Sequence, residues 1–116
     1  MIELIDVLLS KTREGHVNWK PASEISDEEF HVVQKNSVLT IQKKYISSVE
    51  CIEMIVYDSN GRIVSHISGR YTEGWDVPFS FSHDEYERAL SELFYRAQRQ
   101  ALQTDLVIDD IISSFR

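Results

Sequence analysis

The residues of this chain that could do chemistry stand far apart in the sequence. There is one cysteine, Cys51, and there are four histidines, none of them spaced as H-x-H or H-x-x-x-H. A zinc site takes several Cys or His ligands in closely spaced pairs, and Glu50 disfavours a thiolate beside it, so Cys51 is predicted to be an inert structural thiol. Gly-rich phosphate loops and the G-x-S-x-G motif are both absent. We therefore expect no catalytic residue, no metal site, no cofactor and no enzymatic activity.

The best candidate for a binding loop is the segment 68–80, SGRYTEGWDVPFS. It carries four large side chains within thirteen residues: Arg70, Tyr71, Trp75 and Phe79. Tyr, Trp and Arg dominate the energetics of binding surfaces, and long connections within compact domains often have a function. The alternative is that Trp75 and Phe79 fold under the loop and close the end of a sheet.

The chain opens with a helical pattern. Side chains that suit one buried face recur at helix spacing from Ile2 to Thr12, and Gly15 is placed to end the helix in a left-handed conformation. The next segment, HVNWKP, is expected to be short and extended, because Pro21 disfavours a helical conformation of the residue before it. Trp19 within it is predicted to be buried against the first helix.

Four segments have the character of β-strands. EFHVVQ and VLTIQKKY alternate between apolar and polar side chains, and CIEMIVYD and RIVSHI are rich in β-branched residues. Asn60-Gly61, between the last two segments, is the strongest short hairpin signal in the chain. We expect it to form a two-residue type I′ turn, which needs positive φ at both positions.

Two helices are expected after the strands. Ser82 and Glu85 form the capping-box pattern S-x-x-E, and an apolar stripe follows from residue 86 to 97. Thr104 or Asp105 is placed to cap a second short helix. The apolar face of that helix is Ile108, Ile111, Ile112 and Phe115. Strands in a run followed by helices in a run indicate a single α+β domain over residues 1–116: an N-terminal helix, an antiparallel meander of about four strands, and two C-terminal helices packed on the sheet.

The two-residue turn would set the register of the last hairpin. If Ser59 pairs with Arg62, each earlier residue pairs one step further along, and paired residues share a face. One face then forms the core with Leu39, Ile41, Met54, Val56, Ile63 and Ile67 beneath Leu90, Leu93 and Phe94. The other face carries Ile55, Tyr57, Val64 and His66. This second set is too apolar for a freely solvated face. It is a candidate interface, to be covered by the first helix, the last helix, a second copy or a different protein.

The composition narrows the class of protein. The 116 residues are 42% hydrophobic and 27% charged, with a net charge of −7. A broad acidic surface argues against direct binding of nucleic acid. No apolar run approaches the roughly 20 residues of a membrane span, and Glu3 and Asp6 lie where a signal peptide carries basic residues. Together with the single cysteine, this predicts a cytoplasmic protein that has no membrane contact.

Three stretches together resemble a group of small bacterial or mobile-element α+β proteins without assigned activity. The stretches are GHVNWK after the first helix, YDSNGRIV in a hairpin, and the closing LFYRAQRQALQTDLVIDDII. They correspond to a Trp after the first helix, a D-x-x-G-like hairpin and an L-Y-x-x-A-R helix. The shared motifs are structural, so the resemblance implies a bacterial or mobile-element origin and no catalytic or binding residue.

Three functions agree with these observations. The first is a non-enzymatic interaction or regulatory module that binds another protein or a second copy of itself as a homodimer. The second is an acidic inhibitor or immunity-type protein that blocks a basic enzyme or a nucleic-acid-binding surface, and strongly salt-dependent binding would favour it. The third is a small ligand-binding domain or enzyme with a pocket under the 68–80 loop, and a deep pocket that holds an ionisable group with a perturbed pKa would favour it.

Overall fold

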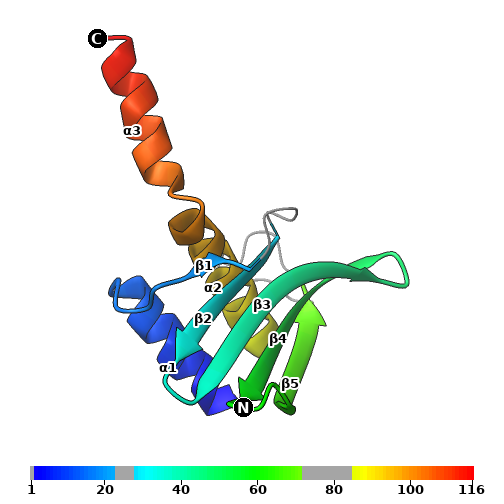
Figure 1. Cartoon of the computed structure of the whole chain (residues 1–116). Coiled ribbons are helices and arrows are strands. Elements are labelled where there is room, and N and C mark those ends of the chain that lie inside the picture. Colours follow the sequence, from blue (N-terminus) through cyan, green and yellow to red (C-terminus); the bar gives the residue numbers. More distant parts are fainter. Residues whose placement is uncertain (1, 23–27, 72–84) are drawn as a thin grey trace.

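The protein folds as one antiparallel sheet with helices on one side (Figure 1). The structure is a computed structural model and describes residues 2–22, 28–71 and 85–116. The elements, in chain order, are α1 (Ile2–Arg13), β1 (Lys20–Pro21), β2 (Glu29–Gln34), β3 (Ser37–Ile46), β4 (Val49–Asp58), β5 (Ile63–Arg70), α2 (Glu85–Ala101) and α3 (Thr104–Ser114). The α+β class, with its leading helix, antiparallel meander and two closing helices, is confirmed. The sheet has five strands in the order β1-β2-β3-β4-β5, because the short β1 pairs with β2.

Both α1 and α2 lie on the same face of the sheet, which we call the inner face (Figure 1). Strand residues alternate between the two faces, so every second residue of β2, β3 and β4 points into this core. The core joins side chains of α1, the sheet and α2: Ile5, Leu9, Trp19, Phe30, Val32, Leu39, Ile41, Ile52, Met54, Leu90, Leu93, Phe94 and Ala97. Val56 and Ile67 are half-buried against it. The predicted core is therefore confirmed, with the exception of Ile63.

Ile63 was expected in the core and is instead 61% exposed. The turn between β4 and β5 has three residues rather than two: Gly61 alone has a positive φ, and its amide donates to the carbonyl of Asp58. Asp58 therefore pairs across to Arg62, and Tyr57 pairs with Ile63. A β-bulge then takes up Val64 before the next pair forms. The bulge adds one residue to β5, and this residue brings the rest of the strand back to the predicted register.

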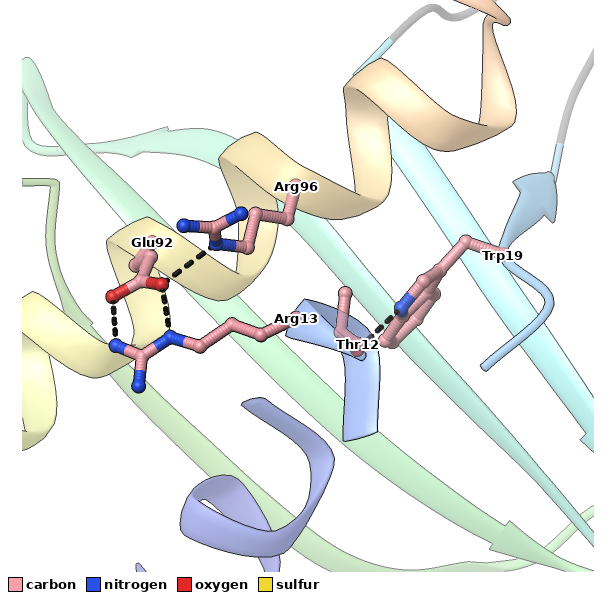
Figure 2. Close-up of polar contacts among 5 residues, drawn as sticks. All are labelled: Thr12, Arg13, Trp19, Glu92 and Arg96. Atoms are coloured by element: carbon pink, nitrogen blue, oxygen red, sulfur yellow. Dashed lines mark hydrogen bonds and ion pairs between the residues drawn. The ribbon is translucent and has the colours of Figure 1, made fainter. Parts of the chain in front are cut away.

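The end of α1 follows the sequence prediction. Gly15 has a φ of +77° and donates to the carbonyl of Thr12, and the amide of His16 donates to that of Lys11. This pair of bonds satisfies the last carbonyls of the helix. The chain then turns back so that Trp19 is buried, and its indole Nε1 donates to Thr12 Oγ1 at 3.0 Å (Figure 2).

One buried carboxylate joins the two helices of the inner face. Arg13, on α1, donates to both oxygens of Glu92, on α2, at 2.6 and 2.5 Å, and Arg96 donates to the same carboxylate at 2.7 Å (Figure 2). Burial raises the pKa of Glu92, but the hydrogen bonds from Arg13 and Arg96 together outweigh burial and hold that pKa below its usual value. Glu92 is therefore a charged clamp between α1 and α2, as expected of a buried ion whose lone pairs are satisfied.

A glycine allows the first turn of α2 to approach the edge strand β5. A Cβ atom on Gly69 would lie 2.9 Å from Cγ of Glu87 and 3.2 Å from Cε2 of Tyr86. The carboxylate of Glu87 is buried there and accepts a hydrogen bond from the amide of Arg70 at 2.5 Å. Gly69 therefore fixes how closely α2 lies on the sheet. The proposed cap of α2 at Ser82 lies outside the described residues.

The last helix behaves differently from α2. Gln103 adopts a left-handed conformation with φ +54°, which ends α2 and redirects the chain. Gln103 is itself the N-cap residue of α3, with no side-chain cap, so the expected cap at Thr104 or Asp105 is wrong. Among the described elements, α3 contacts α2 alone and projects from the rest of the fold (Figure 1). The sheet cover is thus formed by α2 together with α1.

The first prediction concerns the core. Leu93 is fully buried between α2 and the sheet, so Leu93→Ala should lower the free energy of unfolding by about 2–5 kcal/mol. Ile111→Ala removes a similar side chain from the exposed α3 and should change it by less than about 0.5 kcal/mol. Urea denaturation measures both variants. Equal midpoints for the two would contradict this core.

Candidate binding surface

The outer face of the sheet, opposite α1 and α2, changes from apolar to polar along the strands. Cross-strand pairing aligns its residues in rows. The row nearest the β2–β3 and β4–β5 turns is apolar on all four strands; we call it the outer row, and it consists of Val33, Val38, Tyr57 and Ile63. The next row is mixed: His31, Thr40, Ile55 and His66. The third row is polar: Glu29, Gln42, Glu53 and Ser68.

The outer row has no cover in the part of the chain that the structure describes. Val33 is 66% exposed and Ile63 is 61% exposed, while Val38 and Tyr57 are half-buried by their neighbours. A hollow of about 410 Å³ lies at this end of the sheet, lined by Val38, Tyr57 and the residues of the two adjacent turns. An exposed apolar strip beside a hollow is a common feature of protein-binding surfaces.

The structure places the four residues of the predicted interface on or beside this face. Ile55 and His66 pair with each other, and Tyr57 lies in the outer row. Val64 is the bulged residue and is exposed. The sequence analysis missed Val33 and Val38 because it followed the β4–β5 hairpin only, and it missed Ile63 because the expected two-residue turn assigned that residue to the core. Alternation along EFHVVQ and VLTIQKKY was the signal that could have identified Val33 and Val38.

A polar cluster around Glu53 occupies the other half of the outer face. Glu53 is buried although it points outward, because three side chains cover its carboxylate: Lys44 at 2.8 Å, His66 at 2.6 Å and Gln42 at 2.6 Å. Burial raises the pKa of Glu53, and the hydrogen bonds from Lys44, His66 and Gln42 outweigh burial and lower it. A carboxylate that stays ionised and has its oxygens occupied is a poor general acid. The cluster therefore fits a structural role.

The candidate binding loop is only partly described. Arg70 ends β5, where its backbone amide donates to Glu87 and its guanidinium lies 3.6 Å from the same carboxylate. Tyr71 packs against the core with the Lys43 ammonium 4.4 Å from its ring centre. Trp75 and Phe79 lie outside the described residues. The two described members therefore make structural contacts at the edge of the sheet.

The hairpin between β3 and β4 presents a second exposed apolar group. Tyr45, Ile46 and Val49 are exposed at its end, and a hydrogen bond to Glu50 raises the pKa of Tyr45. The turn itself, Ser47-Ser48, has φ values of +51° and +67°. Positive φ at both positions is the type I′ geometry that the sequence analysis expected at Asn60-Gly61. Serine adopts this conformation at a cost, since it has a Cβ atom.

Another exposed apolar surface lies on α3. Five side chains with helix spacing are exposed along it: Val107, Ile108, Ile111, Ile112 and Phe115. We call this set the α3 stripe. Phe115, just after the helix, is 87% exposed. An amphipathic helix normally buries such a stripe, but its five members are exposed in the part of the chain that the structure describes.

Other types of site are not formed by the described residues. Within residues 2–22, 28–71 and 85–116, no three His, Cys, Asp or Glu side chains come together as ligands for a metal ion. Among the described helices, none combines the length and the apolar composition that a membrane crossing requires. Cys51 is buried and unpaired at the start of β4.

No family model, curated protein or solved structure matches this chain. The resemblance to small bacterial α+β proteins therefore stays a prediction. Function has to be inferred from the geometry of the outer face and α3.

The hairpin turn gives a prediction about backbone strain. Replacing Ser47 by Asn and Ser48 by Gly supplies the residues that a type I′ turn favours, and should stabilise the fold by about 1 kcal/mol. The opposite change is Gly61→Ala: φ is +80° there and no atom lies within 4 Å of the added Cβ. That variant should be destabilised by about 1 kcal/mol, for conformational reasons alone. Thermal melts measure both, and a destabilised Ser47/Ser48 variant would argue against the turn geometry.

The buried carboxylates give a prediction about pH. Because the folded-state pKa values of Glu53 and Glu92 are lowered, their stabilisation is complete above the ordinary glutamate value of 4.5 and is lost as the pH falls through the folded values. Glu92→Gln and Glu53→Gln should each be less stable than the wild type at neutral pH. Each should also lose less stability on acidification to about pH 3. Urea midpoints across this range test it; parallel pH profiles for variants and wild type would contradict it.

Proposed function

We propose that this protein is a non-enzymatic, cytoplasmic interaction module that acts by binding a protein through α3 and the outer face of its sheet. The observation that carries the proposal is the α3 stripe, which is exposed along its length on a helix that contacts only α2 among the described elements. Isolated helices of this length are marginal in water, and most of their stability comes from packing of the apolar face. A bound partner would supply that packing.

The chemistry of α3 favours a protein over a lipid surface as partner. The sequence of the helix, TDLVIDDIISS, has three aspartates and no basic residue. Interfacial membrane helices carry Lys and Arg toward anionic lipids, whereas this helix would be repelled by them. An amphipathic helix that inserts into an apolar groove of another protein is a common mode of recognition.

The alternative functions have less support. An acidic inhibitor would bind through exposed carboxylates. Glu53, Glu87 and Glu92 are buried and bonded within the fold, and the exposed carboxylates of the described residues are distributed over α1, the start of α2 and α3. A pocket under the 68–80 loop would involve residues 72–80, which the structure does not describe.

The proposal predicts that binding depends on one side of α3. Ile111→Glu places a charge in the stripe, and Leu106→Glu places the same charge on the opposite side of the helix at similar exposure, 60% against 53%. Tagged full-length wild type, Ile111→Glu and Leu106→Glu would be used to capture partners from bacterial extract and from cells that also express an untagged copy. At least one protein should bind wild type and Leu106→Glu and be reduced tenfold or more with Ile111→Glu, a loss of about 1.4 kcal/mol.

Folding serves as the internal control of that experiment. Neither position belongs to the core, so both variants should have the same melting temperature as the wild type. If the three baits recover the same proteins in equal amounts, α3 is not the binding element.

A further inference from the structure

The outer row and the α3 stripe are complementary in apolar character and in charge. We infer that α3 of one copy docks on the outer face of a second copy, and that two copies exchange this contact reciprocally in a homodimer. The inference rests on the proposed function and names the partner of the same two surfaces.

The first support is the distribution of charge on α3. At about 100° per residue, the stripe from Val107 to Phe115 fills an arc of about 140°. By the same spacing, Asp109 and Asp110 flank the two edges of that arc, and Leu106 lies on the far side. A surface that receives this helix should therefore be apolar in the middle and basic at its borders.

The second support is that the outer face is apolar along the outer row and carries a basic side chain at its border. Exposed Lys35 lies in the β2–β3 turn beside the outer row, and exposed Arg62, bonded to Asp58, lies in the β4–β5 turn. The polar side chains of His31 and His66 border the outer row on its other side. Because Asp58 balances the charge of Arg62, Lys35 supplies the positive charge of this border. In a chain with a net charge of −7, it reduces the repulsion that two acidic copies would otherwise feel.

Charge also argues against the simplest alternative, in which two α3 helices pair with each other. The flanking positions of both helices would then carry aspartates, and like charges at those positions disfavour pairing. The helix is also only 11 residues long, shorter than the several heptads that usually sustain a two-stranded coiled coil. Docking on the sheet avoids both problems.

The size of the contact favours a reciprocal arrangement. A stable complex buries roughly 800 Å² on each partner, and a single helix of three turns on a sheet covers less. Every copy has one α3 and one outer face, so a two-fold dimer makes the contact twice without any additional surface. The outer face remains available for this because α1 and α2 both occupy the inner face.

Sedimentation equilibrium of the purified full-length chain tests the inference, from roughly 5 to 500 µM, the range expected for a contact of this size. Wild type should dimerise, and more weakly as NaCl rises from about 0.05 to 0.5 M. Ile111→Glu in the stripe and Val33→Glu in the outer row should each raise the dissociation constant tenfold or more. The matched controls are Leu106→Glu and Val7→Glu, which carry the same charge at exposed positions outside both surfaces and should stay within twofold of wild type.

Mixing the two defective variants tests whether α3 of one copy contacts the outer face of the other. Ile111→Glu keeps an intact outer face and Val33→Glu keeps an intact α3, so one contact can form between them. The mixture, with one variant fluorescently labelled at its N-terminus, should associate at least threefold more tightly than either variant with itself.

Three results would overturn the inference. One is a wild type that is monomeric throughout this concentration range. Another is a Val33→Glu variant that dimerises like wild type, which would indicate α3–α3 pairing. The last is a mixture that associates no better than its components. If the wild type is monomeric but the extract experiment still finds an α3-dependent partner, the homodimer fails while the proposed function stands.

Discussion

The contact between α1 and α2 decides which surfaces of this protein are buried and which stay open. Glu92 on α2 accepts hydrogen bonds from Arg13 on α1 and from Arg96, and Ile5 and Leu9 of α1 join the same core as α2. With its charge satisfied, Glu92 can be buried without a large penalty. Because the clamp holds both helices side by side on one face of the sheet, neither helix covers the other face. The exposed outer row is a direct consequence of this packing.

The conformation of a single residue between α2 and α3 leaves the α3 stripe exposed. Gln103 in a left-handed conformation turns the chain away from the sheet just where α2 ends. Had the helix continued straight or folded back, the α3 stripe could have covered part of the sheet. Among the described residues, the fold instead exposes apolar side chains on α3 and on the outer face, with aspartates beside the α3 stripe and Lys35 beside the outer row. The proposed binding function rests on this combination.

The β4–β5 hairpin shows how local irregularities preserve the pattern of the faces. The turn has one residue more than the Asn60-Gly61 signal predicts, and alone it would have moved every residue of β5 to the opposite face. The bulge at Val64 compensates, so that Ile67 and Gly69 still point inward, where α2 needs them. Only Ile63, between the turn and the bulge, changes face. The residue that the sequence assigned to the core is thereby added to the outer row.

Local signals in the sequence determined the helices, the strands and their order, because these depend on periodicity and on neighbours such as Gly15 at the end of α1. They also determined most of the core, since alternation along a strand fixes which side chains share a face. The tertiary structure alone decided which face of the sheet each helix covers. Burial on any apolar surface lowers the free energy of an apolar stripe. The sequence pattern of the α3 stripe is therefore the same whether the stripe packs on its own sheet or stays exposed. That choice depends on the Glu92 clamp, which joins residues 79 positions apart, and on the conformation of Gln103, which no sequence pattern marks.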